Sequence, residues 1–132
     1  MGLYSYNILP INFCDYLINL YETDTGNHER VDKESKPTFT QLNLNKYHAN
    51  VVSNLCNYFS VALDFYKKDV PQAKYLPQVK YLEEFRIKKY AVGGQDRFDE
   101  HVDVVNHQSS RRCLAMLFLS LIHISEPTRR RT

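Results

Sequence analysis

The segment FRIKKYAVGGQDRFDEHVDVV (residues 85–105) predicts two β-strands joined by a glycine turn. In its first half, Phe85 and Ile87 alternate with charged residues, which is the period of a strand with one apolar and one polar face. The glycine pair that follows readily adopts positive φ. A continuous apolar run at residues 113–118, CLAMLF, then predicts a third, buried strand.

The second of these strands carries His101 and Asp103 two positions apart. Side chains at i and i+2 of a strand point to the same face, so an imidazole nitrogen and a carboxylate oxygen would meet at one point. One imidazole and one carboxylate, completed by a second His, form the ligand set of non-haem Fe(II) oxygenases. The dipeptide spacing alone is weak evidence because it arises often by chance.

Residues 1–22 predict a short strand followed by a helix. The strand is expected before Pro10, where the alternating residues are Tyr4, Tyr6 and Ile8. Asn12 is the predicted N-cap of the helix, and Ile11 is expected to staple onto Tyr16. The packing face of the helix has the spacing i, i+4, i+7 and i+8 and consists of Phe13, Leu17, Leu20 and Tyr21.

The middle of the chain predicts a long loop and the strongest helix. Residues 23–38 are polar and show no apolar period, so they are expected to form a surface loop in which His28 is solvated. An extended piece at residues 38–44 leads into a helix over about residues 45–68, with His48 on its polar face. The apolar stripe of this helix consists of Val51, Leu55, Phe59, Ala62 and Tyr66.

Composition fits one domain with a modest core: 132 residues, 43% hydrophobic and 24% charged. No apolar stretch approaches the roughly 20 residues of a spanning helix, and no cleavable leader is recognisable at the amino end. A cytoplasmic protein with no membrane partner is therefore expected. The cysteines form no C-x-x-C pair, which favours buried thiols over a disulfide framework or a zinc site.

The carboxyl end is expected to have a different origin from the rest of the chain. Residues 119–129, LSLIHISEPTR, resemble the translation of a transposase-type sequencing adapter, whose bases decode to these residues in order. We therefore expect residues 119–132 to be a non-native, adapter-derived tail and residues 1–118 to be a partial domain. The tail holds three of the 17 basic and one of the 15 acidic side chains, so residues 1–118 have no net charge. That balance disfavours a nucleic-acid partner.

The native carboxyl-terminal part resembles the iron-binding half of the 2-oxoglutarate- and Fe(II)-dependent dioxygenases, specifically the prolyl-4-hydroxylase-like branch. The family pattern is Arg-x-x-x-Tyr, a glycine turn, an aromatic residue, His-x-Asp, and a hydrophobic strand ending in Tyr-Leu-Asn. In this chain the pattern consists of Arg86, Tyr90, Gly93, Gly94, Phe98, His101, Asp103 and residues 114–118. Phe98 stands where a Tyr is common, and the pattern breaks at Leu119. The earlier segment LPINFCDYLINLYE is similar to the family's amino-terminal strand and helix.

This resemblance implies an α+β fold in which amino-terminal helices pack on an incomplete double-stranded β-helix, a jelly-roll-like architecture. It implies that His101 and Asp103 bind Fe(II) and that Tyr90 contributes to the 2-oxoglutarate pocket. The implied reaction consumes dioxygen and 2-oxoglutarate and hydroxylates a C–H bond of a peptidyl or small-molecule substrate. Ascorbate stays open as an additional cofactor.

The resemblance also implies parts that this chain lacks. Family members place a second His ligand several dozen residues downstream, followed by an Arg or Lys that anchors 2-oxoglutarate. His107 follows the same strand too closely to serve and is expected in a loop, and His123 lies in the tail. The chain as written is therefore expected to be inactive. The alternative is a non-catalytic sheet-and-helix binding module in which His101 and Asp103 are surface residues.

Overall fold

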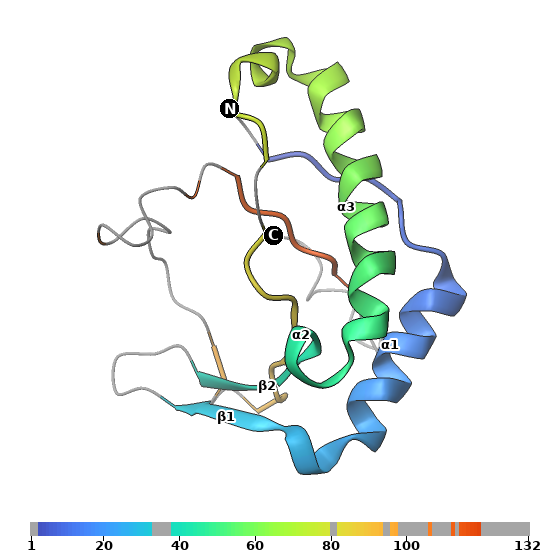
Figure 1. Cartoon of the computed structure of the whole chain (residues 1–132). Coiled ribbons are helices and arrows are strands. Elements are labelled where there is room, and N and C mark those ends of the chain that lie inside the picture. Colours follow the sequence, from blue (N-terminus) through green and yellow to red (C-terminus); the bar gives the residue numbers. More distant parts are fainter. Residues whose placement is uncertain are drawn as a thin grey trace.

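The computed structural model describes residues 3–32, 38–79, 82–93, 96–97, 106, 112 and 114–119. These residues form, in chain order, α1 (Ile11–Thr23), the 3₁₀ helix η1 (Thr25–Asn27), β1 (Glu29–Asp32), β2 (Thr38–Asn43), α2 (Leu44–Tyr47), α3 (Ala49–Asp69), the 3₁₀ helix η2 (Pro71–Tyr75) and β3 (Arg86–Lys89). Helices and a small antiparallel sheet of order β1-β2-β3 thus coexist in the described part (Figure 1). The predicted α+β class is confirmed.

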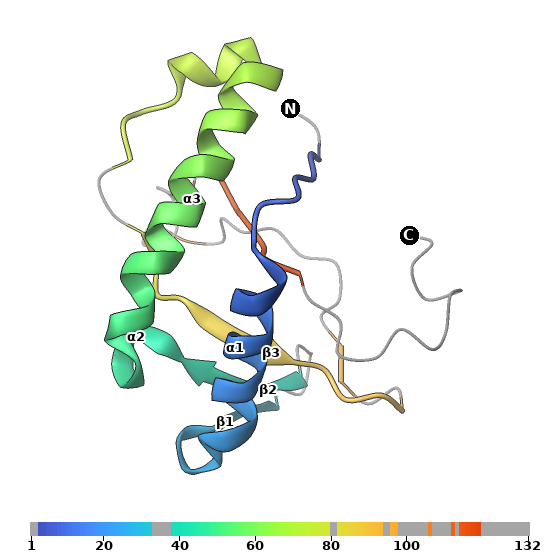
Figure 2. The same ribbon diagram turned by 90° about the vertical axis from the view of Figure 1, so that its right-hand side faces the viewer.

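β2 is the central strand of this sheet and has two different faces. In the register, Thr40 lies opposite Arg30 of β1 and Lys89 of β3, and Leu42 lies opposite Ile87. Residues directly opposite in an antiparallel pair share a face. Leu42 is fully buried and packs with Tyr21 of α1, so α1 covers the Leu42 face, as Figure 2 shows. The extended piece predicted at residues 38–44 is confirmed.

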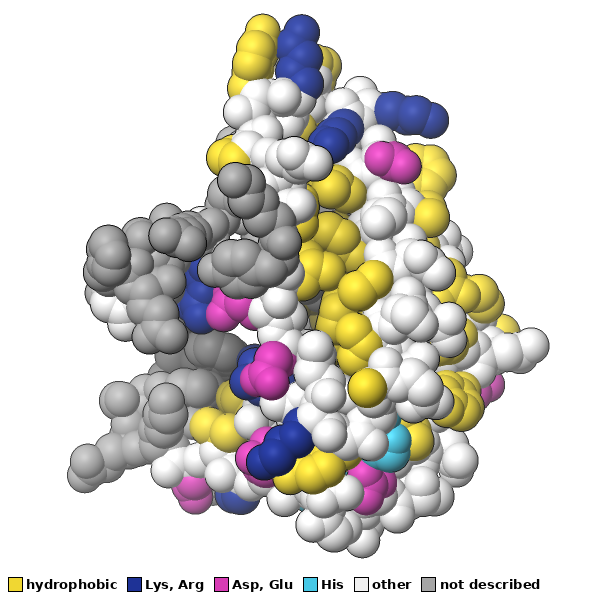
Figure 3. Space-filling model, viewed as in Figure 1, with side chains coloured by type: hydrophobic (Ala, Val, Ile, Leu, Met, Phe, Trp, Pro, Cys, Tyr) yellow, Lys and Arg dark blue, Asp and Glu magenta, His cyan; other side chains and the backbone are white. Residues whose placement is uncertain are grey.

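The core consists of two apolar clusters that α3 connects. The first contains the buried residues Tyr21, Leu42, Leu44, Val51 and Leu55, and the second contains Tyr66, Val70 and Ala73. The predicted stripe of α3 is therefore confirmed, except that Phe59 is only half-buried. Figure 3 shows the hydrophobic side chains along the length of α3 and the Lys side chains near its end. Lys67 and Lys68 there complement the negative end of the helix dipole.

Residues 114–119, the red segment in Figure 1, do not form the buried strand that their apolar sequence predicts. Leu114 packs against the second cluster and Phe118 against the first. The residues between alternate, with Met116 half-buried and Leu117 81% exposed. The prediction of a buried strand is wrong, because the described residues 114–118 form no strand and their alternate side chains, Ala115 and Leu117, lie outside the core.

The predicted amino-terminal strand is also wrong. Tyr4, Tyr6 and Ile8 lie in a segment with no assigned strand, and the aromatic residues pack on the end of α3 instead. The Tyr6 hydroxyl donates a hydrogen bond of 2.7 Å to Asp69, and the Tyr4 ring meets the Tyr66 ring edge-on at 5.5 Å. Burial, and then Asp69, raise the pKa of Tyr6 to about 12. The alternating pattern here reflects contact with a helix rather than with a sheet.

α1 begins earlier than predicted. Pro10 occupies the N-cap position and Ile11 is the first helical residue, so Asn12 is not the cap. Ile11 is 75% exposed, which rules out the predicted staple onto Tyr16. The predicted packing face is confirmed, because Phe13, Leu17 and Leu20 pack against the first cluster together with buried Tyr21.

The predicted loop at residues 23–38 contains η1 and β1. β1 has a single apolar residue, Val31, and gains its structure from antiparallel pairing with β2. Backbone pairing leaves no apolar period in the sequence, so the pattern could not reveal this edge strand.

The predicted long helix is interrupted at its start. Asn43 caps α2 by accepting a 3.0 Å hydrogen bond from the Lys46 backbone N–H. His48 then has non-helical backbone angles and separates α2 from α3. The predicted end is confirmed, since α3 stops at Asp69, just before Val70 and Pro71. β3 is shorter than the strand predicted from residue 85 onward, but the partly buried Phe85 and Ile87 do face the first cluster.

Leu55→Ala is expected to lower the free energy of unfolding by about 2 to 5 kcal/mol, because it leaves a cavity between α3 and the first cluster. Val61→Ala in the same helix truncates a side chain that is 43% exposed, so it should change the free energy of unfolding by less than about 1 kcal/mol. Urea unfolding followed by circular dichroism measures both values. Equal losses in the two variants would contradict the assigned orientation of α3.

Candidate functional site

Tyr90, the predicted cosubstrate residue, lies on the face of the sheet opposite α1. It directly follows β3 and stands opposite Phe39 of β2, since Thr40 pairs with Lys89 in the register. The two ring centroids are 5.3 Å apart, and Phe39 is 4% exposed while Tyr90 is 40% exposed. Burial, and then the charge of Asp96, raise the pKa of Tyr90. Its hydroxyl is therefore protonated at neutral pH and can donate a hydrogen bond.

Lys88 lies on the same face of β3 as Tyr90. Its Nζ is 4.8 Å from the centroid of the Phe39 ring, in the position of a cation–π contact. Loss of hydration, and then the nearby Arg86, lower the pKa of Lys88. An ammonium group and a phenol hydroxyl thus flank one buried phenyl ring.

The turn after β3 is held by Asp96. Gly93 has φ of 120°, which confirms the predicted positive φ at this position. Asp96 Oδ2 accepts a 2.9 Å hydrogen bond from the Ala91 N–H, and its other oxygen lies 2.6 Å from Arg30 of β1. One carboxylate therefore closes the turn and ties it to the edge strand.

Arg97 returns the chain to β2. Its N–H and C=O both bond to Thr38, at 3.1 and 2.9 Å. The Leu44 N–H bonds to Phe85, so the even-numbered residues of β2 direct their backbone groups toward the β3 side. Arg97 accordingly occupies the same edge of β2 as β3. A simple hairpin would have paired the second segment with β3 itself, whereas here the chain leaves this edge after Tyr90 and rejoins it at Arg97.

The predicted iron ligands His101 and Asp103 lie outside the described residues, as do Phe98, His107 and His123. Their roles stay predictions. Within the described ranges, no group of three or more His, Cys, Asp and Glu side chains could hold a metal ion. The same ranges contain no helix long and apolar enough to cross a membrane. Cys14 and Cys56 are free and only half-buried.

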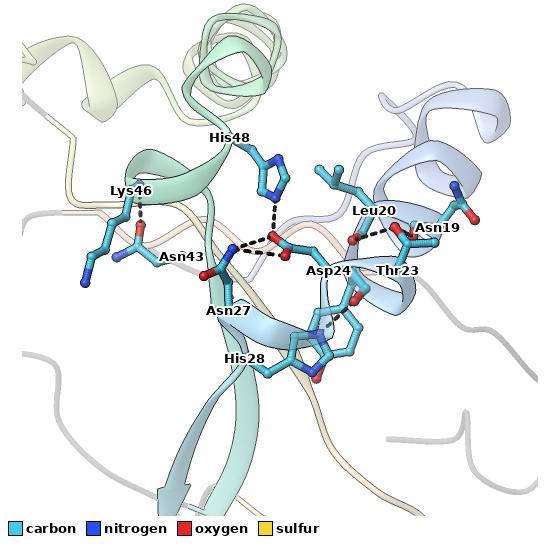
Figure 4. A network of polar contacts seen from close by, with 10 residues as sticks. Asn19, Leu20, Thr23, Asp24, Asn27, His28, Asn43, Lys46 and His48 are labelled. Atoms are coloured by element: carbon cyan, nitrogen blue, oxygen red, sulfur yellow. Dashed lines mark hydrogen bonds and ion pairs between the residues drawn. The ribbon is translucent and has the colours of Figure 1, made fainter.

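A cluster of polar side chains, not expected from the sequence, joins the end of α1 to the start of α3 (Figure 4). His48 Nε2 lies 2.5 Å from Asp24 Oδ2, and Asn27 donates to both Asp24 oxygens at 3.0 and 3.2 Å. His28 donates to the Tyr21 carbonyl at 2.7 Å and stacks on the Tyr21 ring. The predictions that His28 is solvated and that His48 lies on a polar helix face are therefore wrong.

The hydrogen bond from His48, followed by those from Asn27, lowers the pKa of Asp24. The sequence offered one usable signal for this cluster, namely short polar side chains directly after the end of a helix, where they commonly bond to one another and to the backbone. Its partner His48 is distant in sequence and became visible only in the fold. The cluster fixes the chain direction into β1.

Comparisons of this chain with models of known protein families, with curated proteins and with solved structures find no match.

Asp24→Asn is expected to lower the melting temperature by a few degrees at pH 7, because the ionised carboxylate favours the folded state. The folded-state pKa of Asp24 lies below its unfolded value, so this contribution is complete above about pH 4 to 5. It is lost as the pH falls through the folded-state pKa. Thermal unfolding between pH 7 and pH 2 measures the difference in melting temperature between this variant and the wild type.

Asp64→Asn, in an exposed position of α3, is the matched control and should follow the wild type throughout. If the melting temperatures of Asp24→Asn and the wild type differ by the same amount down to pH 2, the assigned role of the carboxylate charge is contradicted.

Proposed function

We propose that this chain is the amino-terminal part of a 2-oxoglutarate- and Fe(II)-dependent dioxygenase of the prolyl-4-hydroxylase-like branch, acting on a C–H bond of a peptidyl or small-molecule substrate. The observation that carries the proposal is the position of Tyr90, half-exposed on the sheet face opposite α1 and in contact with Phe39. Asp96 and Arg97 then bring the chain back to the same sheet edge just before the His-x-Asp motif. The order of motif residues in the sequence gives independent support.

The fold is proposed to be an incomplete double-stranded β-helix. In such a fold one face of a sheet carries helices and the other face lines a cavity. The position of α1 on the Leu42 face of the β1-β2-β3 sheet, with Phe39, Lys88 and Tyr90 on the other face, supports this proposal. Strands beyond residue 118 would be needed to complete the cavity.

The donor set fits part of an iron site. His101 and Asp103 supply one imidazole and one carboxylate, which are two of the three protein ligands of non-haem Fe(II) oxygenases. Bound iron would supply the oxidation chemistry that couples dioxygen reduction to decarboxylation of 2-oxoglutarate. The residues of this chain would hold the metal, and Tyr90 would donate a hydrogen bond that orients the cosubstrate.

The proposal carries one geometric requirement. Arg97 shares the face of Thr38, which is the α1 side of the sheet, whereas Tyr90 lies on the opposite side. Regular alternation from Arg97 would put His101 and Asp103 on the α1 side as well. If the two ligands and Tyr90 are to share one cavity, the alternation of side chains between the two faces must shift by one residue between Arg97 and His101. A β-bulge produces such a shift.

Mn²⁺ is the probe for the two proposed ligands, because it resists oxidation by air and broadens the NMR signals of nuclei close to it. Substoichiometric Mn²⁺ added to the 132-residue protein should broaden the His101 ring signals first. Asp103→Asn should remove this selectivity, since a single imidazole seldom retains Mn²⁺.

The other four His residues are internal controls in the same spectrum. Equal broadening of all His signals, or unchanged broadening in Asp103→Asn, would favour the non-catalytic binding module over the dioxygenase.

The 132-residue protein with Fe(II), 2-oxoglutarate and ascorbate should release no iron-dependent succinate, because two protein ligands hold Fe(II) too weakly for turnover. Succinate quantified by mass spectrometry checks this. Iron-dependent release above background would contradict it. Sequencing the parent gene beyond the codon for Phe118 should reveal a second His followed by an Arg or Lys, and their absence would count against the dioxygenase.

A further inference from the structure

β1 is an edge strand whose outer side is open within the described part of the chain. Figure 1 shows β1 at the lower margin of the sheet, beside β2. The even-numbered residues of β2 direct their backbone groups toward β3, so the odd-numbered ones direct theirs toward β1, where they stand opposite Glu29 and Val31. The backbone N–H and C=O groups of Arg30 and Asp32 therefore point outward, and no described backbone group pairs with them.

The side chains of these two outward residues carry opposite charges on the same face. Arg30 and Asp32 stand opposite Thr40 and Thr38, so both lie on the α1 side of the sheet. The Arg30 side chain is 45% exposed, and Asp32 is exposed as well. Arg30 also contacts Asp96 at 2.6 Å, but a guanidinium group has five N–H donors and can contact a second carboxylate. β1 thus offers a backbone edge flanked by one cation and one anion.

An open strand edge can pair with an extended segment of another molecule, including a second copy of the same chain. In an antiparallel pair of β1 strands, outward residues must meet outward residues, which leaves registers centred on Arg30, Val31 or Asp32. The first of these opposes two guanidinium groups, and the last opposes two carboxylates. The register centred on Val31 places Arg30 opposite the partner's Asp32, and it uses both outward residues. Charge complementarity therefore selects this register.

We propose that β1 pairs antiparallel with β1 of a second copy of this chain, centred on Val31, so that two three-stranded sheets join into one. Arg30 and the partner's Asp32 exchange two backbone hydrogen bonds, and the two-fold axis repeats this pair. The two Val31 side chains meet on the other face of the sheet. Charged residues on a short edge strand commonly prevent such pairing, whereas in this register the opposed charges attract. The inference does not depend on the proposed function.

Exchange of charges between two variants tests the register. Asp32→Arg opposes two cations in each pair, and Arg30→Glu opposes two carboxylates, so each variant alone should dimerise at least about tenfold more weakly than the wild type. A mixture of the two variants again opposes unlike charges in each pair, and it should form mixed dimers with an affinity close to that of the wild type. Asp64→Arg, in an exposed position of α3, is the charge-matched control and should dimerise like the wild type.

Sedimentation equilibrium of the 132-residue protein measures these dimerisation constants. Because β1 is four residues long, the interface is small, so concentrations up to about 1 mM are required. Thermal unfolding verifies that each variant is folded.

Cross-linking at Val31 gives a second readout, in a background where the three natural cysteines are replaced by Ser. In the proposed register the two Val31 Cα atoms form a pair without hydrogen bonds, about 4.5 Å apart, which is within disulfide range. Mild oxidation should therefore link two copies of Val31→Cys. Glu29→Cys is the control on the same face, because the two Glu29 Cα atoms would be about 13 Å apart and should link far less.

A wild type that stays monomeric up to about 1 mM, or an Asp32→Arg variant that dimerises like the wild type, would overturn the proposal. Mixed variants that stay monomeric although both are folded, or equal cross-linking at positions 29 and 31, would also overturn it. Arg30→Glu additionally removes the contact with Asp96. If that variant does not fold, Asp32→Arg and Val31→Cys still decide the outcome.

Discussion

Burial of Leu42 at the centre of β2 is the interaction on which the described structure depends. Leu42 has no exposed surface and contacts the first apolar cluster, to which α1, α2 and α3 all contribute. The backbone of the same strand pairs with β1 on one side and β3 on the other. Since neither a lone strand nor a lone hairpin is stable in water, the helices stabilise the sheet through this contact. The contact between Phe39 and Tyr90 on the opposite face is positioned as a consequence.

Sequence patterns predicted the elements that are stabilised by the burial of apolar side chains. The stripe of α3 and the packing face of α1 were found because a period of 3.6 residues records directly which side chains leave water. β1 was missed because it is held by backbone pairing and carries one apolar residue, Val31. Residues 113–118 were predicted as a buried strand because their composition is apolar throughout, yet among the described residues 114–118 only alternate side chains are partly buried. Composition records hydrophobicity, and the packing partner decides burial.

In the candidate site, too, the sequence predicted some features and missed others. Tyr90 was predicted from the resemblance and lies on the sheet face opposite α1, whereas its contact with Phe39 depends on the register of β2 against β3. The hydrogen bond between His48 and Asp24 joins residues 24 positions apart and has no local sequence pattern. Contacts of this kind arise from tertiary packing, so single-sequence reasoning identifies the chemical groups but not the pairs that they form.

The register of β2 links the core to the position of Tyr90. Leu42 and Phe39 lie on opposite faces, and both are buried. A slip of β2 by one residue would turn Gln41 or Asn43 toward the first cluster and expose Leu42, which would bury an amide without a partner. The register is therefore fixed by the core. Because Tyr90 follows β3, which pairs with the same strand, the burial that fixes Leu42 also fixes the position of Tyr90 beside Phe39.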